Sequence, residues 1–306
     1  MRDVTALGEG MVEFNQTRPA DRTWLQGFGG DTSNALIAAA RAGASTAYLT
    51  RVGADTFGDM LLRLWEDEGV DTRVVERDGD APTGLYFVTH GPQGHAFTYR
   101  RAGSAASAMT PDWLRQDAVQ AVLRDTRFLH VSGISLALSR SARHTALAAM
   151  RQARAAGARV AFDANLRLKL WSLDEAREGI GQAVAACDLF LPSLDDMVAL
   201  QGLQDAGAII DWGHAAGART VVVKLGAEGC VVSDGQRRER IHGHRVQAVD
   251  ATGAGDCFSG NLLARLAAGD DVVAAARYAN AAAALAVQGW GAVAPLPRPD
   301  AVRSLL

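Results

Sequence analysis

Short apolar runs rich in β-branched residues alternate with longer amphipathic stretches through the second half of this chain of 306 residues. Apolar runs of this kind are typical of strands that are covered by helices on both faces of a parallel sheet. The expected strands are residues 128–132, 159–163, 189–191 and 220–224, and the expected helices are residues 140–155, 173–186, 206–216, 255–268 and 272–288. This order predicts an α/β fold with a doubly wound sheet flanked by helices.

The first hundred residues follow a different pattern, in which apolar and polar residues alternate. Residues 23–28, 84–89 and 96–100 are expected to be strands, joined by turns such as Gly91-Pro92-Gln93-Gly94. Strands of this kind form a sheet with one face toward solvent. We therefore expect a single domain over residues 1–306, interrupted by a small β-sheet lid formed by about residues 10–28 and 82–102.

Two further expectations concern this half of the chain. The lid is expected to expose Phe87 and Phe97 on one face, through which two lids could pair in a homo-oligomer. Thr110 and Pro111 predict the start of a helix, with the threonine as N-cap and the proline at the first helical position.

Charge and composition exclude several classes of partner. The net charge is -3 with acidic and basic residues interspersed, so the sequence offers no basic stripe for nucleic acid. No apolar run approaches the ~20 residues that span a bilayer, and the first residues lack the pattern of a signal peptide. The three cysteines are widely spaced and form no Cys-x-x-Cys pair, which is typical of buried free thiols. We therefore expect a cytoplasmic protein without a membrane or nucleic-acid partner.

Residues 250–256, Asp-Ala-Thr-Gly-Ala-Gly-Asp, carry the strongest chemical signal in the chain. They follow an expected strand at residues 245–249 and precede an apolar helix. Glycines at a helix start leave backbone N–H groups uncovered, and these groups bind phosphate at the positive end of the helix. Asp256 beside such a loop suits a base that takes the proton from a hydroxyl during phosphoryl transfer. The alternative is an ordinary strand-to-helix turn in which Asp256 interacts only with the helix dipole.

Longer strings around this segment resemble a known family. Asp250-x-Thr252-Gly253-Ala254-Gly255-Asp256-x-Phe258, with Gly260 after it, closely resembles the C-terminal signature of the ribokinase-type (PfkB) carbohydrate kinases. Gly29-Gly30-Asp31-Thr32-Ser33-Asn34 and Val52-Gly53-x-Asp55-x-x-Gly58 resemble its N-terminal motifs. The resemblance runs from Val4 to about Pro297 and implies a ribokinase-like fold and phosphorylation of a sugar by ATP with Mg²⁺.

The resemblance also implies roles for individual residues. Asp256 would be the catalytic base, Gly253, Ala254 and Gly255 would hold the phosphoryl group, and Gly30 and Asn34 would lie against sugar hydroxyls. The positions that match the nucleotide site are Asn165, Ser193, Lys224, Gly226, Gly229, Gly253, Gly255 and Asn280. Ser193-Leu194-Asp195-Asp196 replaces the family's Asn-x-x-Glu motif, so Asp196 would contact magnesium either directly or through water.

Other stretches resemble the 2-keto-3-deoxygluconate kinases within this family. They are Gly84-Leu85-Tyr86, Phe97-x-Tyr99-x-Arg101, Ser132-Gly133-Ile134-Ser135, Phe162-Asp163-x-Asn165-x-Arg167 and Val222-Val223-Lys224-x-Gly226-Ala227. This resemblance implies that Tyr86, Tyr99, Arg101 and Arg167 contact the substrate. Two arginines suit the carboxylate of a sugar acid, because a guanidinium binds a carboxylate through two parallel hydrogen bonds.

The expected reaction is phosphorylation of 2-keto-3-deoxygluconate at its C6 hydroxyl. Three alternatives of the same fold remain open: a fructokinase, a ribokinase, and a kinase of the galactonate epimer. A non-catalytic sugar-binding or regulatory protein is a further alternative, although it would have no need of Asp256. A dehydrogenase is excluded, because the turn Leu7-Gly8-Glu9-Gly10 lacks the Gly-x-Gly-x-x-Gly pattern and leads into a second apolar strand-like run.

Overall fold

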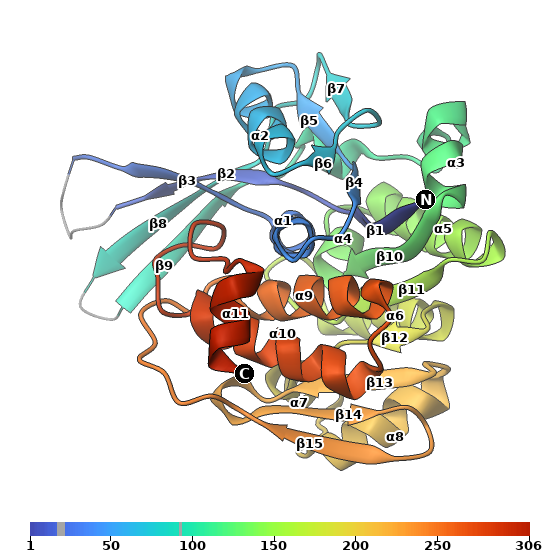
Figure 1. The fold of residues 1–306 in the computed structure, drawn as a ribbon. Helices are drawn as coiled ribbons and strands as arrows, with labels where there is room; N and C mark the ends of the chain where they lie inside the picture. The colour runs from blue at the N-terminus through green and yellow to red at the C-terminus, as the bar shows by residue number, and fades with distance from the viewer. Residues whose placement is uncertain (17–21, 92–93) are drawn as a thin grey trace.

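The computed structural model describes residues 1–16, 22–91 and 94–306, and within these residues it contains one large sheet and two smaller ones (Figure 1). The large sheet has nine strands in this described part of the chain. In spatial order they are β15 (Arg238–His242), β14 (Gly229–Ser233), β13 (Thr220–Lys224), β12 (Leu189–Phe190), β11 (Arg159–Asp163), β10 (Thr126–Ser132), β1 (Arg2–Leu7), β4 (Thr46–Leu49) and β6 (Val70–Asp71).

The large sheet confirms the predicted doubly wound α/β fold. The strands from β6 to β13 are parallel, whereas β14 and β15 continue the edge in antiparallel pairing. The chain starts at β1, moves outward through β4 and β6, and then returns to β10 on the other side of β1. The order of strands therefore reverses between β1 and β10, and ligands bind at such a reversal in open α/β sheets.

Helices cover both faces of the large sheet (Figure 1). The valines of β13 are apolar on both faces of the strand, so both faces must be covered. Val221 and Val223 pack in the core on one face, and Val222 packs in the core on the other. The helices are α1 (Asp31–Arg41), α2 (Thr56–Asp67), α3 (Asp117–Arg124), α4 (Gly133–Ala137), α5 (Arg140–Ala155), α6 (Leu173–Ala186), α7 (Leu194–Gln201), α8 (Ala206–Ala216), α9 (Ala254–Ala268), α10 (Val272–Ala286) and α11 (Pro299–Leu305), with 3₁₀ turns at Ala105–Ala108, Trp113–Arg115 and Gly226–Glu228.

A small sheet extends from the body of the molecule (Figure 1). In the described residues it has four strands, in the order β3 (Leu25–Gly29), β2 (Met11–Asn15), β8 (Leu85–Gly91) and β9 (Gly94–Arg100). Residues 17–21 of the expected lid, and Pro92 and Gln93 of its expected turn, lie outside the described residues. A third sheet pairs β5 (Arg51–Gly53) with β7 (Glu76–Asp78).

The register of the small sheet corrects one prediction. Phe97 pairs with Val88, and Phe87 pairs with Thr98. Side chains alternate between the two faces of a strand, so Phe87 and Phe97 lie on opposite faces and do not form one apolar surface. Phe87 stacks on Phe14, whereas Phe97 stacks on Tyr99. The predicted pairing of two lids through these phenylalanines therefore loses its basis.

Two local predictions are also wrong. Residues 245–249 form no strand, and Val249 instead donates its backbone N–H to the carbonyl of Val287 at 2.7 Å. Pro111 does not open an α-helix, because Thr110 begins a turn that leads into the 3₁₀ segment Trp113–Arg115. The α-helix starts only at Asp117, after Gln116 has left the helical conformation with ψ 132°.

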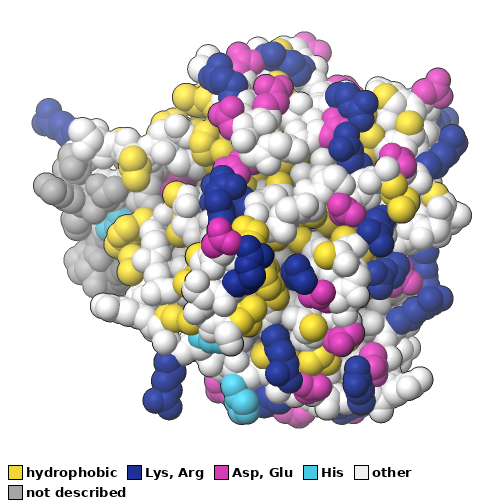
Figure 2. Space-filling view, viewed as in Figure 1, with side chains coloured by type: hydrophobic (Ala, Val, Ile, Leu, Met, Phe, Trp, Pro, Cys, Tyr) yellow, Lys and Arg dark blue, Asp and Glu magenta, His cyan; other side chains and the backbone are white. Residues whose placement is uncertain are grey.

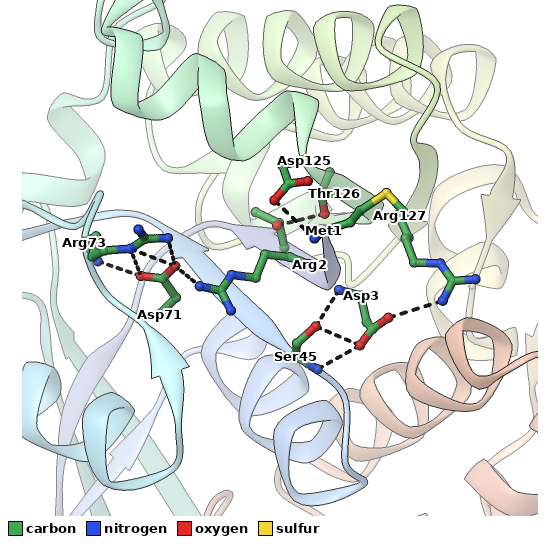
Figure 3. Close-up of polar contacts among 10 residues, drawn as sticks. Met1, Arg2, Asp3, Ser45, Asp71, Arg73, Asp125, Thr126 and Arg127 are labelled. Atoms are coloured by element: carbon green, nitrogen blue, oxygen red, sulfur yellow. Dashed lines mark hydrogen bonds and ion pairs between the residues drawn. The ribbon is translucent and has the colours of Figure 1, made fainter.

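Polar side chains connect four neighbouring strands, β10, β1, β4 and β6, at one edge of the sheet (Figure 3). Asp3 of β1 accepts a hydrogen bond from Ser45 Oγ at 2.7 Å, just before β4, and another from Arg127 of β10 at 3.3 Å. Arg2 pairs with Asp71 of β6 at 2.5 Å. These contacts hold the edge of the sheet that lies opposite the carboxyl ends of its strands.

The surface view agrees with the near-neutral charge. Acidic and basic side chains are interspersed over the face shown in Figure 2. Among the described residues, none of the helices combines the length and the apolar character that crossing a membrane requires.

Candidate active site

The candidate site lies where β1, β10, β11 and β13 end and where α1 and α9 begin. Glu9 follows β1, Asp163 ends β11 and Lys224 ends β13. Asp31 stands in the first turn of α1 and Asp256 in the first turn of α9. Because the carboxyl ends of parallel strands meet at one edge of a sheet, residues from distant parts of the sequence converge there.

The glycine-containing loop before α9 has the conformation that a phosphate site needs. Gly253 is the N-cap of α9 in the left-handed conformation, with φ 76°, where glycine is the favoured residue. It has no side chain to cap the helix, so the amides of Gly255 and Asp256 remain available at its positive end. The amide of Ala254, which we expected to hold a phosphoryl oxygen, instead donates to Ala251 O at 3.2 Å.

Asp250 holds this loop in place. One of its carboxylate oxygens accepts hydrogen bonds from the backbone N–H and the hydroxyl of Thr252, at 2.9 and 2.6 Å. The other accepts from the backbone N–H of Gly291 at 2.9 Å. Asp250 therefore links the loop before α9 to the C-terminal segment at Gly291 through hydrogen bonds.

Asp256 is held against α1 by close helix packing. A Cβ at Gly260 would lie 2.0 Å from the carbonyl oxygen of Ala35, so only glycine lets α9 approach α1 this closely. Asp256 lies one turn before Gly260, and its carboxylate accepts a hydrogen bond of 2.8 Å from Asn34 Nδ2. The structure thus brings together two predicted site residues that are 222 positions apart.

The pKa of Asp256 suits a base that works near neutral pH. Burial is the largest cause that raises this pKa to about 7, and the charges of Asp31 and Asp163 raise it further. The hydrogen bond from Asn34 and the charge of Lys224 act in the opposite direction. A carboxylate with such a pKa accepts a proton from a hydroxyl more readily than an ordinary aspartate.

Half-buried Lys224 and buried Asp163 form an ion pair beside the glycine-containing loop. Lys224 Nζ lies 2.5 Å from Asp163 Oδ2, and Ser259 of α9 donates to the same oxygen at 3.0 Å. A Cβ at Gly255 would lie 3.4 Å from Lys224 Nζ, so the ammonium group faces the expected phosphate loop. Asp163 was part of a motif quoted from the sequence but received no role there, because its partners are visible only in the fold.

Asp31 is a second acid that sequence reasoning missed. It is 8% exposed, and its Oδ2 accepts a hydrogen bond of 2.8 Å from Asn165 Nδ2. Asn165 has a positive φ of 29°, which for a residue other than glycine indicates a constrained position. We expected Asn165 on the nucleotide side, but its side chain is directed to the start of α1, beside Asn34.

The two arginines expected to bind a carboxylate make separate contacts. Arg101 is 9% exposed, and its Nε donates to Oε2 of the buried Glu9 at 2.7 Å. Its guanidinium also lies 5.8 Å from the ring centre of Tyr99. Arg167 is exposed and donates to its neighbour Leu166 O at 2.7 Å. Burial raises the pKa of Asp196, and the charge of Arg167 offsets a small part of that rise. Glu9 therefore already balances the charge of Arg101, and this partner was not anticipated from the sequence.

The remaining residues expected on the sugar side have partners of their own. Tyr86 is buried and donates its hydroxyl to Glu13 Oε2, and its ring lies 5.8 Å from that of Tyr99. Gly30 has φ 105°, and a Cβ there would lie 2.2 Å from Glu9 O. The backbone alone therefore requires glycine at position 30.

Of the residues expected on the nucleotide side, Ser193, Gly226 and Gly229 lie beside the ends of β12, β13 and β14, whereas Asn280 lies in α10. Ser193 caps α7 by accepting from the backbone N–H of Asp196 at 3.1 Å, and Asn280 donates to His242 O at 2.8 Å. A Cβ at Gly229 would lie 2.1 Å from Ile241 O, whereas the position of Gly226 is open. Close backbone packing thus accounts for glycine at position 229. The side-chain amide of Asn280 already donates to a backbone carbonyl, that of His242.

Carboxylates near the loop fit a magnesium ion that keeps most of its waters. The pKa of Asp196 is raised, first by burial and then by the charge of Asp163. The described residues contain no group of three or more potential metal-ligating side chains. Mg²⁺ is commonly held by only one or two carboxylates together with phosphate oxygens and water, so this donor set is sufficient.

Comparison with known proteins identifies the family. The family model described as pfkB family carbohydrate kinase matches residues 1–299. The chain is 34% identical over 307 residues to the 2-dehydro-3-deoxygluconokinase of Escherichia coli K12, which covers 96% of this chain and 97% of that protein. It is 32% identical over 320 residues to probable fructokinase-4 of Arabidopsis thaliana, covering 99% of this chain and 96% of the relative.

A solved structure supports the same conclusion. The crystal structure of a putative ribokinase II from Escherichia coli in complex with ATP and Mg²⁺ aligns with a TM-score of 0.90 at 25% identity, covering 100% of this chain and 99% of that one. The protein therefore belongs to the pfkB family of carbohydrate kinases and is an ATP-dependent sugar kinase.

Proposed function

We propose that this kinase phosphorylates 2-keto-3-deoxygluconate at the C6 hydroxyl. The observation that carries the transfer is the position of Asp256, whose pKa is raised to about 7 at the open amide end of α9. The choice of acceptor rests on Arg101 and Arg167, which lie near the carboxyl ends of the strands, and on the similarity to a 2-dehydro-3-deoxygluconokinase.

Different residues of the site would accept the proton, stabilise the transferred phosphoryl group and hold the metal ion. Asp256 takes the proton of the acceptor hydroxyl, and Asn34 orients its carboxylate through the 2.8 Å hydrogen bond. The amides of Gly255 and Asp256 and the ammonium of Lys224 stabilise the negative charge of the transferred group. Asp196 would hold Mg²⁺ directly or through water, and the ion neutralises phosphate charge when bound.

The small sheet would act as the lid of this site. Tyr86 and Tyr99 lie on the same face of it and are linked to Glu13 and Arg101. Closure of such a sheet over the acceptor would exclude water, which could otherwise receive the phosphoryl group. The domain arrangement proposed is thus one kinase domain over residues 1–306 with a lid from about residues 10–28 and 82–102.

A panel of acceptors tests the proposal. Consumption of ATP is measured with 2-keto-3-deoxygluconate, its galactonate epimer, fructose and ribose at equal concentrations. The proposal requires that kcat/KM be at least about tenfold higher for a sugar acid than for either neutral sugar. A higher value for fructose would refute the assignment of the acceptor but leave the kinase activity itself intact.

One observation favours a neutral sugar as second candidate. Glu9 is 1% exposed and already neutralises Arg101, so the guanidinium is less free to attract a carboxylate. A fructokinase would need only hydroxyl partners, which Asn34 and Asp31 can supply. Arg101→Lys separates the two cases, because it should raise KM for a sugar acid selectively but affect all acceptors alike if Arg101 only pairs with Glu9.

A further inference from the structure

Arg41, the last residue of α1, bonds to two parts of the chain that are distant from it in sequence. Its Nε and one terminal nitrogen donate to the carboxylate of Glu68, which follows α2, at 3.0 and 2.6 Å. Its other terminal nitrogen donates to the carbonyl oxygens of Val293, Ala294 and Leu296, at 3.0, 3.5 and 2.7 Å. The side chains of Arg41 and Glu68 are only 12% and 13% exposed, so water screens these contacts little.

The carbonyls that Arg41 binds belong to a segment that packs against the glycine-containing loop before α9. Gly291 donates its backbone N–H to Asp250 at 2.9 Å, and a Cβ at Gly253 would lie 3.0 Å from the Cβ of Ala292. Ala292 directly precedes the first carbonyl that Arg41 binds. Residues 291–296 therefore lie between Arg41 and the loop, so a shift of this segment would move the loop.

Helix α1 also holds the proposed base. Asn34 donates to Asp256 at 2.8 Å, and Arg41 follows seven positions later, which is close to two helical turns. The two side chains therefore lie on the same face of α1. Burial raises the pKa of the Cys257 thiol and the charge of Arg41 acts in the opposite direction, which agrees with a position of Arg41 near the start of α9.

We propose that Arg41 is a positioning residue, which acts through residues 291–296 to hold the loop before α9 where it meets the transferred phosphoryl group. A guanidinium suits this task because its donors point in several fixed directions, toward a carboxylate on one side and carbonyls on the other. The ammonium of a lysine carries its three donors on one nitrogen and cannot reach both sets of acceptors. The inference rests on the proposed role of the loop, but it does not depend on which sugar is the acceptor.

The test compares two nucleotides that differ in the phosphate that is transferred. Binding of ADP and of the β,γ-imido analogue of ATP is measured by calorimetry with Mg²⁺ and without acceptor, in the wild type and in Arg41→Lys. The variant should raise Kd for the analogue roughly tenfold and change Kd for ADP less than about twofold, because only the analogue reaches the loop. In turnover, kcat should fall at least about tenfold while KM for the sugar stays within about twofold.

Two further variants frame this comparison. Arg265→Lys is the matched control, because Arg265 in the last turn of α9 makes the same kind of paired contact with Asp270, at 2.8 and 2.9 Å. It should leave Kd for both nucleotides unchanged. Gly253→Ala alters the loop itself, where φ is 76°, and should reproduce the selective loss of the analogue.

The outcomes separate a positioning role from a structural one. Equal weakening of both nucleotides in Arg41→Lys, or a lower Tm with unchanged Kd values, would show that Arg41 only stabilises the fold and would overturn the proposal. A selective loss in Gly253→Ala but not in Arg41→Lys would leave the role of the loop intact and refute that of Arg41 alone. Unchanged binding of the analogue in Gly253→Ala would refute the role of the loop, and the role of Arg41 with it.

A second variant covers the case in which Arg41→Lys fails to fold. Glu68→Ala removes both hydrogen bonds that orient the guanidinium and leaves Arg41 in place. It should raise Kd for the imido analogue at least about threefold, with Kd for ADP nearly unchanged. Equal Kd values for the analogue in Glu68→Ala and the wild type would also overturn the proposal.

Discussion

The pKa of Asp256 should move in opposite directions when its two neighbours on α1 are changed. Asn34→Ala removes the 2.8 Å hydrogen bond that stabilises the ionised carboxylate. Asp31→Asn removes a negative charge that disfavours it. Both variants alter the same helix face beside the same carboxylate, so a general disturbance of the site would not produce shifts of opposite sign.

The expected size of each shift follows from the contacts. A hydrogen bond to a charged group contributes about 1.5–3 kcal/mol, and one pKa unit corresponds to about 1.4 kcal/mol. Asn34→Ala should therefore raise the pKa of Asp256 by about one to two units from its value of about 7. Asp31→Asn should lower it by about one unit, because a neighbouring carboxylate shifts a pKa by this order.

The assay is the pH dependence of kcat/KM between pH 5 and pH 9, which reports the pKa of the free enzyme. In the proposed mechanism Asp256 must be ionised to act as the base, so activity should rise with pH through about 7 in the wild type. The midpoint should move to higher pH in Asn34→Ala and to lower pH in Asp31→Asn, with no movement in Asp117→Asn, which alters an exposed acid in the first turn of α3. Shifts of the same sign in the two site variants, or an unchanged midpoint in both, would refute the reasoning.

Further predictions concern the base, the helix contact and the acceptor. Asp256→Asn should lower kcat at least about 100-fold while KM for the sugar changes little, and turnover close to normal would contradict the assignment of the base. The folded pKa of Asp256 lies above its ordinary value of 3.8, so its stabilising contribution is present below pH 4 and is lost as pH rises through about 7. The same variant should therefore raise Tm at pH 8 but not at pH 4, and equal changes at both would argue against a raised pKa. Gly260→Ala should destabilise the fold by about 1–3 kcal/mol in a urea titration, because its Cβ would lie 2.0 Å from Ala35 O. Arg101→Lys should raise KM about tenfold for a sugar acid and leave KM for fructose within about twofold.

Much of the fold could be predicted because its elements have strong periodicity. Helices α5, α6 and α8 and strands β11 and β13 have the bounds that the sequence pattern indicates. The wrong predictions lie where tertiary contacts override the local sequence pattern. Within the described residues, segment 245–249 pairs with no strand, and Val249 bonds instead to Val287. The register of β8 and β9 places two phenylalanines on different faces.

The sequence by itself was enough to propose the phosphate loop and Asp256 as the base. Glycines, a first-turn acid and the following helix are local features, and their chemistry follows from residues that are close in the chain. Only the tertiary structure decided which side chains surround Asp256. Asn34 is 222 positions away from it, Asn165 is 134 positions away from Asp31, and Glu9 is 92 positions away from Arg101. A pKa depends on burial and on neighbouring charges, and a hydrogen bond depends on distance, so none of these properties is present in the chain before α1, α9 and the strand ends meet.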